Sequence, residues 1–415
     1  MVDSIRVLHF ADTHVGMENY GKTDPETGLS SRVVDFLHRM DEIVEYARTQ
    51  DVDLIIFAGD AFKTRAPNPT FQREFAHRVR DFAEIAPIVL LVGNHDLPPS
   101  VLKASSIEIY DTLAVPNVWV AYDYTGRVVE TKRGPVYVAS APYPIRARLL
   151  ERANTAGMTI AQTDELLQTE LTRILDHLAQ EADQQDMPRL LTAHFTVGGA
   201  VVGSERGIML GRDVAVPKSI LADPRWDYVA LGHIHKHQNL TAGRIDAPPV
   251  VYSGSIERID FGEEGDPKGF CMVELNRDET TWEFIRLDAR PFVTLKADLR
   301  RSLNPTQDAL NLVESHNLRQ AVVRMFLQFT PESEARFNEF AVREALKRSG
   351  VFHFAALRKE IDQPARARLG ASPEGLTPDQ LLERYLISKE VQPERREELM
   401  ETANSIFESE SNASV

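Results

Sequence analysis

The sequence predicts an α/β sandwich, followed by a small α/β domain and a helical C-terminal segment. Three observations support this fold class. Short, nearly continuous apolar runs alternate with amphipathic stretches through the first half of the chain. Strand-like runs then recur without helices between residues 250 and 287, and the pattern changes again near Arg290-Pro291. Apolar strands separated by helices are typical of sheets covered on both faces.

The strands expected in the first half are short runs of mostly apolar residues: Ile5–Phe10, Leu54–Ala58, Ile88–Val92, Val136–Ala139, Leu190–Ala193 and Tyr228–Leu231. Between them, helices are expected where apolar residues recur every three or four positions: Ser30–Thr49, Pro69–Ala83 and Thr163–Glu181. The runs VVYSGS, GFCMVEL and TTWEFIRL, which lie between Val250 and Leu287, predict strands that complete the sandwich.

A second unit is expected beyond Arg290. Its predicted strands are Phe292–Leu299, Ala321–Phe329 and Val351–Leu357, and its predicted helices are Pro305–His316 and Glu332–Ser349. This part of the sequence holds no cluster of ligand-type residues. We therefore expect residues 1–289 to form the functional domain and residues 290–361 to form a small accessory domain.

The last part of the chain predicts a linker and two helices. Residues 362–376 are rich in proline and glycine, which is typical of a linker. In the following segment, residues 377–410, Thr377-Pro378-Asp379-Gln380 has the pattern of a helix start with a capping box. Each helix carries one apolar stripe: Leu381, Leu382, Tyr385 and Leu386, then Leu399, Ala403, Ile406 and Phe407. Two such short helices bury too little surface to be stable alone, so they dock on the body of the protein or, as we prefer, on a partner.

Composition narrows the class of protein. At 415 residues the chain is too long for one core of usual size, and its 43% hydrophobic and 26% charged residues are ordinary for a globular protein. The sequence has no membrane-length apolar run and no signal-peptide pattern, and the single cysteine, Cys271, fits a reducing compartment. We therefore expect a cytoplasmic protein without membrane association. The net charge of −15 disfavours DNA phosphates, although a bound metal pair would restore about four positive charges where they matter.

Five short motifs follow predicted strands: Asp12-Thr13-His14, Gly59-Asp60, Gly93-Asn94-His95-Asp96, His194 and Gly232-His233-Ile234-His235. Loops after the carboxyl ends of such strands meet at one edge of the sheet, so residues far apart in sequence can form one site. The glycines allow tight turns where the backbone leaves each strand.

The side chains of these motifs suit a pair of divalent metal ions. Seven of them offer carboxylate, amide or imidazole donors without thiolate: Asp12, His14, Asp60, Asn94, His194, His233 and His235. Such a set suits Mn, Fe, Zn or Co and differs from a structural zinc site. Seven donors exceed the needs of one tetrahedral ion but suffice for two ions that share a carboxylate. Metal pairs of this kind promote in-line phosphoryl displacement, so the sequence predicts phosphoester hydrolysis.

Each motif also has an ordinary explanation. Asp-x-His can be a strand end, Gly-Asp a simple turn and Gly-His-x-His a solvated loop. The complete set in this order, each member after a strand, favours the metal centre. His9 lies inside a strand and is interpreted as a core residue. Several basic residues near the motifs could contact phosphate, but each is better explained as a solvated charge: Arg32, Lys63, Arg65, Lys103 and Arg206.

The order of the motifs resembles that of the calcineurin-like metallophosphoesterase superfamily. The resemblance implies that Asp12, His14, Asp60 and His235 hold one metal. It implies that Asp60, Asn94, His194 and His233 hold the second, with Asp60 bridging. His95 would be catalytic, facing the scissile phosphate as general acid or charge stabiliser, and Asp96 would orient it.

Within the superfamily, residues 6–16, 59–62 and 93–98 are similar to DNA double-strand-break-repair nucleases. The unit after Pro291 matches their capping domain, and residues 377–410 match their ATPase-binding helix-loop-helix. Lys63 departs from the pattern, because relatives often carry a histidine or an acid there, which leaves its role in DNA binding open.

This resemblance implies an Mn²⁺-dependent DNA nuclease, a 3′–5′ exonuclease on duplex ends and an endonuclease on single strands. Its expected partners are DNA ends and an SbcC-type coiled-coil ATPase, within a heterotetramer built on a homodimer. The implied roles are double-strand-break and hairpin processing, recombination and repair. We do not expect this chain itself to hydrolyse ATP.

Two other functions stay open. A metallophosphatase acting on small-molecule phosphoesters would use the same site but would leave the accessory domain and the terminal helices without a role. A non-enzymatic DNA-end scaffold, in which the metals only order the fold, is disfavoured by the complete set of donors.

Overall fold

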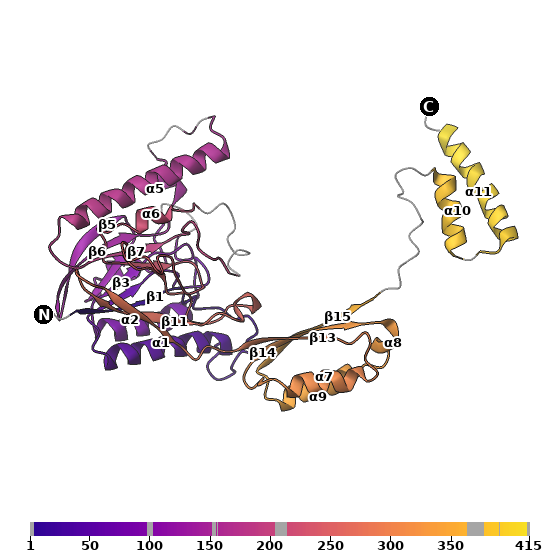
Figure 1. The fold of residues 1–415 in the computed structure, drawn as a ribbon, viewed down its shortest axis with the longest axis horizontal. Coiled ribbons are helices and arrows are strands. Elements are labelled where there is room, and N and C mark those ends of the chain that lie inside the picture. The colour runs from indigo at the N-terminus through magenta and orange to yellow at the C-terminus, as the bar shows by residue number, and fades with distance from the viewer. Residues whose placement is uncertain are drawn as a thin grey trace. The chain divides into compact units, whose positions relative to one another are not determined.

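The structure, a computed structural model, describes residues 4–97, 103–151, 155, 157–203, 214–362, 377–389 and 391–412 (Figure 1). The chain divides into two compact units. The first comprises the described residues up to 295, together with 313–325 and 343–356. The second comprises residues 296–312 and 326–342 and the described residues from 357 onward.

The first unit is built on two six-stranded sheets. The first has the order β12-β11-β1-β2-β3-β4 and the second the order β5-β6-β7-β8-β10-β9. The strands of the first are β1 (Ile5–Phe10), β2 (Leu54–Phe57), β3 (Ile88–Leu91), β4 (Val118–Ala121), β11 (Gly269–Leu275) and β12 (Thr281–Arg286). Those of the second are β5 (Thr125–Thr131), β6 (Gly134–Ala141), β7 (Arg189–His194), β8 (Tyr228–Gly232), β9 (Gln238–Asn239) and β10 (Val250–Tyr252). Strands β1 to β4 are parallel to one another, as are β6, β7, β8 and β10.

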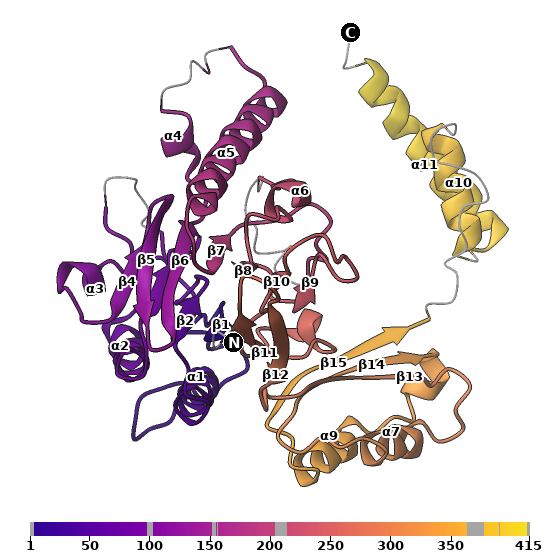
Figure 2. The same cartoon turned by 60° about the vertical axis from the view of Figure 1, so that its left-hand side comes forward.

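The two sheets pack face to face and helices cover their outer faces (Figures 1 and 2). Helices α1 (Ser31–Thr49) and α2 (Pro69–Ala83) cover the first sheet, and α5 (Ile160–Asp183) covers the second. The sequence of β2 is apolar throughout because both faces of the strand are covered. Ile55 packs toward the helices and Ile56 toward the second sheet. The predicted α/β sandwich is therefore confirmed.

Most predicted elements of this unit are present with ends shifted by a few residues. Ser30 caps α1 by accepting a hydrogen bond from the Arg32 amide, and Thr159 begins α5 with a capping box, before the predicted start at Thr163. The sequence did not predict the three strands β4, β5 and β9. It also did not predict the short helices α3 (Ile109–Thr112), α4 (Arg146–Leu149) and α6 (Lys218–Leu221) or the 3₁₀ helix η2 (Phe261–Glu263). Strand β5 has no continuous apolar run because it lies at the edge of its sheet and is largely exposed and polar.

A third sheet, β13-β14-β15, follows, with strands β13 (Phe292–Asp298), β14 (Val322–Phe329) and β15 (His353–Ile361) and helix α7 (Pro305–Glu314). The single helix predicted over Glu332–Ser349 is wrong. The segment forms α8 (Pro331–Glu334) and α9 (Glu339–Arg348) instead. Thr330 caps the first turn, and the side chain of Asn338 accepts a hydrogen bond from the Ala341 amide and so begins a second helix. Strand β15 begins and ends later than predicted.

The chain ends in α10 (Pro378–Ser388) and α11 (Pro393–Asn412), which pack against each other. The predicted helix start is confirmed, since the Thr377 amide donates to Gln380 Oε1 at 3.2 Å. Of the predicted stripe, Leu386 is buried and Tyr385 is 50% exposed. Leu381, Leu382, Leu399 and Ala403 are partly buried. The side chains of Ile406 and Phe407, and residues 363–376 of the predicted linker, lie outside the described part.

Among the helices that the structure describes, none combines the length and apolar character needed to cross a membrane.

Candidate metal centre

The carboxyl ends of parallel strands bring the predicted motifs together. Asp12 follows β1, Asp60 follows β2 and Asn94 follows β3, while His194 ends β7 and His233 follows β8. The donors come from both sheets, so the site lies where the two sheets meet at one edge. The carboxylates and imidazoles are almost completely buried: Asp12, His14, Asp60, His194, His233 and His235.

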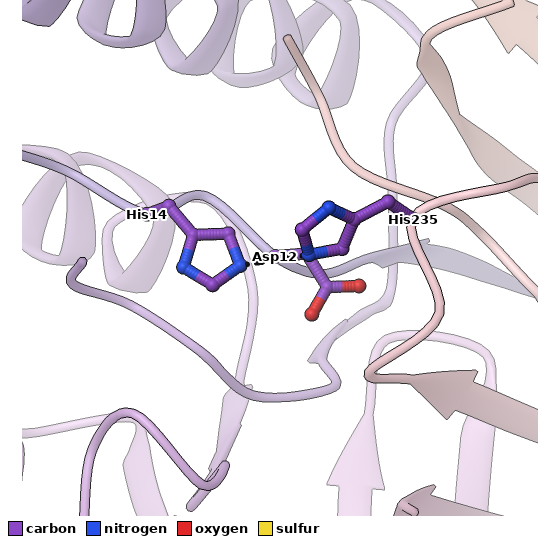
Figure 3. A group of neighbouring side chains, drawn as sticks. All are labelled: Asp12, His14 and His235. Atoms are coloured by element: carbon purple, nitrogen blue, oxygen red, sulfur yellow. Dashed lines mark hydrogen bonds between the residues drawn. The ribbon is translucent and has the colours of Figure 1, made fainter. Parts of the chain in front are cut away.

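One group consists of Asp12, His14 and His235, whose ligand atoms all lie within 4.8 Å of one another. The Nε2 atoms of His14 and His235 are 3.0 Å apart. Figure 3 shows the two rings pointing toward each other with the Asp12 carboxylate beside them. His235 lies 221 positions after His14 in the sequence, yet the three side chains converge on one point.

A second group consists of Asp60, His194 and His233. Asp60 Oδ2 lies 3.4 Å from His194 Nε2 and 3.8 Å from His14 Nε2, so this carboxylate stands between the two groups. Asn94 joins the second group through its Oδ1, which is 3.1 Å from His194 Nε2 and 2.9 Å from His233 Nδ1. The structure therefore brings all seven predicted donors together, with Asp60 at the centre.

The contacts within the groups fit divalent cations. Two imidazole nitrogens facing each other at 3.0 Å share at most one hydrogen, and His14 Nδ1 is buried with no hydrogen-bond partner among the described residues. A cation between such rings would satisfy their lone pairs. The mixture of carboxylate, amide and imidazole donors without sulfur is one that Mn, Fe, Zn or Co accepts.

The charges of the site also fit bound divalent cations. Burial alone would raise the pKa of Asp60, but His194, His95 and His14 together hold it well below its usual value. Burial would likewise lower the pKa of His194, but the neighbouring Asp60 carboxylate raises it to about 9. The ionised Asp60 thus favours positive charge at this position, which a bound cation would supply.

The backbone at four of the donors is strained. Asp12, His14, Asp60 and His233 have φ values of 53°, 38°, 61° and 92°. Non-glycine residues rarely adopt this left-handed region, at about 1–3 kcal/mol each. Hydrogen bonds between neighbouring loops hold the conformation, since the Asp12 amide donates to Gly59 O at 3.0 Å and the His14 amide to Asp60 O at 3.1 Å. Such strain, concentrated at one cluster of polar residues, is typical of functional sites.

All three motif glycines are required by close approach. A Cβ atom would lie 2.4 Å from His194 Nδ1 at Gly59, 2.2 Å from Asp60 Oδ1 at Gly93 and 2.1 Å from Ala58 O at Gly232. Gly59 also has φ of +100°, whereas Gly93 and Gly232 do not have a positive φ. The expectation that these glycines serve tight turns therefore holds for Gly59, while Gly93 and Gly232 mainly leave room for the central carboxylate and for the Ala58 carbonyl.

His95 lies on the rim of the centre. Its Nδ1 is 2.7 Å from Lys63 O, and its amide donates to Asp60 Oδ1 at 2.9 Å. Its ring centroid is 4.9 Å from that of His14, and its ligand atom lies within 4.8 Å of those of His14 and Asp60. Its position next to the donors leaves one ring nitrogen, Nε2, for a substrate or an ion.

Asp96 holds the loops and not the His95 ring. Its carboxylate accepts hydrogen bonds from the amides of Gly93, Asp60 and Ala61 at 2.9–3.0 Å. The loops after β2 and β3 are thereby joined. Any effect of Asp96 on His95 passes through the backbone, since the ring itself pairs with Lys63 O.

Sequence reasoning missed the residues that orient the histidines. Glu263 Oε1 is 2.8 Å from His235 Nδ1, and Glu263 Oε2 is 2.8 Å from Lys268 Nζ. The side chains of Glu263 and Lys268 are both completely buried. Likewise His194 Nδ1 lies 2.6 Å from Ala58 O. In each case the ring nitrogen that points away from the centre has a partner, which directs the other nitrogen toward a metal.

Other predicted residues do not enter the centre. His9 is fully buried between Tyr228 and Leu231 O, as the core interpretation expects. Arg32 lies in the first turn of α1, where it is fully buried and pairs with Asp35. Its interpretation as a solvated or phosphate-binding loop residue is therefore wrong. Arg206 lies outside the described residues.

One further sequence motif lacks the structure that would give it a function. Residues 16–23, GMENYGKT, have the Gly-x-x-x-x-Gly-Lys-Thr spacing of a phosphate-binding loop. Such a loop leads directly into a helix, but here Thr23 forms a bridge with Ser30 and α1 begins only at Ser31. The spacing therefore lacks the structural context of a nucleotide-binding loop.

Residues 5–237 match the family described as calcineurin-like phosphoesterase. The chain is similar to the D subunit of nuclease SbcCD from Bacillus subtilis, with 28% identity over 344 residues, 76% of this chain and 83% of the relative. It is similar to the protein of the same name from Rhodobacter capsulatus, with 28% identity over 289 residues, 65% of this chain and 66% of the relative. A solved structure from Thermus thermophilus aligns with 68% of this chain and 100% of its own, at 15% identity and a TM-score of 0.36.

The matched segment spans more than half of the chain and contains all seven donors that meet around Asp60. Their geometry fits a pair of divalent cations of the kind that hydrolyses phosphoesters. The chain belongs to the calcineurin-like phosphoesterase family.

Proposed function

We propose that this protein is an Mn²⁺-dependent DNA nuclease, a 3′–5′ exonuclease on duplex ends and an endonuclease on single strands. The convergence of seven buried donors on Asp60, at one edge of the sandwich, carries the proposal. The choice of a nuclease over a phosphatase is supported by two relatives that are both named as part of a nuclease and that align with most of the chain.

We assign the donors to two metals. Asp12, His14, Asp60 and His235 would hold the first, and Asp60, Asn94, His194 and His233 the second, with Asp60 bridging. Two cations held there would supply a water activated for attack and positive charge facing the phosphate. The partners behind the rings, Glu263 for His235 and Ala58 O for His194, would keep the donor nitrogens in place.

His95 would act on the phosphate directly. A carbonyl oxygen only accepts hydrogen bonds, so His95 Nδ1 donates to Lys63 O and Nε2 is left for the substrate. With Nε2 also protonated, the imidazolium ring would give that proton to the leaving oxygen or stabilise the charge of that oxygen. The hydrogen bond from its amide to Asp60 Oδ1 fixes the distance between this group and the metal centre.

We further propose that residues 1–289 form the nuclease domain, residues 290–361 a capping domain, residues 362–376 a linker and residues 377–410 the binding segment for an SbcC-type coiled-coil ATPase. The complex would be a heterotetramer built on a homodimer, and it would process DNA breaks and hairpins in recombination and repair. The names of the relatives, each the D subunit of SbcCD, support a multi-subunit enzyme. The single buried Cys271 supports a cytoplasmic location.

The test compares substrates. Purified protein with Mn²⁺ is given a blunt DNA duplex, a single-stranded oligonucleotide and a nucleotide monoester, and the products are resolved by electrophoresis and phosphate release. We expect both DNA substrates to be cut and the monoester to be left, with all activity lost in Asp60→Asn. Hydrolysis of the monoester alone would identify a phosphatase. If none of the three substrates is hydrolysed although the metal is bound, the protein would be a non-enzymatic scaffold.

A further inference from the structure

A cavity of about 450 Å³ lies at the carboxyl ends of β4 and β6. Its walls come from the connection after β4, the segment after β6, and the helices α4 and α5, which Figure 2 shows next to each other. The volume falls within the range of about 300–1,000 Å³ that is typical of small-ligand sites. None of the metal donors lines it, so it is a separate site within the described part of the first unit.

Tyr143 forms a wall shared with the metal centre. It lines the cavity, and its ring centroid lies 5.7 Å from that of His233 and 6.4 Å from that of His194. Its amide donates to Val92 O at 3.1 Å, directly before the loop that carries Asn94 and His95. The position of the cavity is therefore fixed relative to the second group of donors.

The cavity offers aromatic surface and hydrogen-bonding groups. Tyr122, Tyr124 and Tyr143 line it, and Tyr122 is 39% exposed. Tyrosine rings of this kind offer surfaces on which a flat ring can stack.

The charges of the wall do not select an anion. Arg148 lies 3.5 Å from Asp123, and Arg173 lies 3.0 Å from Glu170. Both arginines are thus paired with carboxylates, and Glu151 adds one more acid. A phosphate would gain little here, whereas an uncharged base could use the carboxylates as acceptors for its N–H groups.

We propose that this cavity binds one nucleobase of a single-stranded DNA segment whose backbone crosses the metal centre. The inference rests on the proposed nuclease function. Stacking on aromatic side chains accepts any of the four bases, so the cavity would position a strand without reading its sequence. A base in a duplex is not free to enter such a cavity, whereas one in a single strand is. The cavity would therefore serve the endonuclease activity.

The first experiment measures binding by calorimetry in the full-length protein with Mn²⁺. The ligands are thymidine 5′-monophosphate and deoxyribose 5-phosphate, which lacks the base. We expect the base to add about tenfold in affinity, the size of one base–aromatic stack. Tyr122→Ala should remove this gain, and Tyr122→Phe, which keeps the ring, should retain it. Equal affinity of the wild-type protein for both ligands, or no effect of Tyr122→Ala in a folded variant, would overturn the proposal.

The second experiment asks whether the base belongs to the substrate strand. Single-stranded oligonucleotides that each contain one abasic nucleotide, moved along the strand, are cut by the wild-type protein and by Tyr122→Ala. We expect KM to rise about tenfold at one abasic position in the wild-type protein, with kcat unchanged, and no such position in the variant. A flat profile with tighter binding of the base-bearing ligand would mean that the cavity takes free nucleotides, which overturns the role for DNA. If no oligonucleotide is cut at all, the nuclease function itself fails, and the calorimetry still decides whether a base is bound.

Discussion

Asp60 stands at the point where the two groups of donors meet, and its neighbours leave it little freedom. Its amide is held by Asp96, one of its carboxylate oxygens accepts from the His95 amide, and the other faces His194. Because the same loops carry the donors and the proposed acid, a change at any of these residues reaches the others. A test of these residues therefore needs variants that separate metal binding from proton transfer.

His95→Ala should separate them. We expect the variant to bind Mn²⁺ as the wild-type protein does and to lose about 10²–10⁴-fold in DNA cleavage, the contribution typical of general acid catalysis. Calorimetric titration with Mn²⁺ and a single-turnover cleavage assay measure the two properties. His77→Ala, at an exposed position on α2, is the matched control. Loss of metal binding in His95→Ala would make His95 a ligand, which its distance from His14 and Asp60 also allows.

Glu263→Gln tests the orientation of His235. Glutamine keeps an acceptor for His235 Nδ1 but removes the negative charge that polarises the ring. Outer-shell changes of this kind lower metal affinity about 10–100-fold, and we expect that range for the weaker of the two Mn²⁺ binding steps.

Glu279→Gln, in an exposed turn, serves as the control for Glu263→Gln. The melting temperature without metal shows whether the Glu263–Lys268 pair, which is fully buried, also stabilises the fold. Unchanged affinity for both Mn²⁺ ions would remove Glu263 from the centre.

The seven donors could be predicted from sequence because each follows a strand whose apolar pattern is clear. Glu263 could not, because it lies in the short 3₁₀ helix η2, between two strand signals, where periodicity says nothing of its direction. The same applies to Tyr143 and Tyr122. Their position depends on how the two sheets meet, and no local pattern encodes that.

The apolar layers on both faces of each sheet explain which elements the sequence could and could not predict. Each central strand has one face against a layer of helices and its opposite face against the second sheet. Its sequence is therefore apolar throughout and easy to recognise. The edge strand β5 lacks this pattern. The break between α8 and α9 depends on two caps, Thr330 and Asn338, within a stretch whose apolar spacing continues as one helix.

Helix α1 carries a largely buried ionic cluster that ties it to the start of the third sheet. Asp35 lies 2.6 Å from Arg32 and 2.6 Å from Arg290, and Arg290 stacks over Phe352 at 3.5 Å. Arg32 is fully buried and lies 3.7 Å from Glu257 as well. All these residues belong to the first unit. Removing one carboxylate from such a cluster leaves a buried cation without its closest partner.

Asp35→Ala should therefore lower the free energy of unfolding of the first unit by about 3–5 kcal/mol. Asp41→Ala is the control on the same helix, because Asp41 is about half exposed and pairs with Arg78 at the surface, where an ion pair contributes about 0–1 kcal/mol. Urea denaturation of both variants gives the comparison. Equal losses of unfolding free energy in the two variants would show that the ionic cluster does not stabilise the first unit.

The net charge of −15 conflicts with a protein that binds DNA by itself. Affinity for phosphates depends on basic groups, and the positive charge of the proposed metals is local to one centre. A partner that supplies the basic surface resolves the conflict. The helices α10 and α11 are the segment of this chain for which a partner is proposed.

The exposed side of α10 should carry the contact. Tyr385 and Ile387 are each 50% exposed, whereas Leu386 is buried and serves the fold of the segment. Tyr385→Ala should weaken binding of an SbcC-type ATPase by about 30-fold, since a buried aromatic anchor contributes roughly 2 kcal/mol or more to an interface. Cleavage of a short single-stranded oligonucleotide by the isolated chain should not change. Calorimetry with the purified ATPase measures the first property, and Glu383→Ala, one exposed residue on the same helix, is the control. If Tyr385→Ala and Glu383→Ala bind the ATPase equally well, the contact lies elsewhere on the chain, and the conflict between charge and substrate needs another solution.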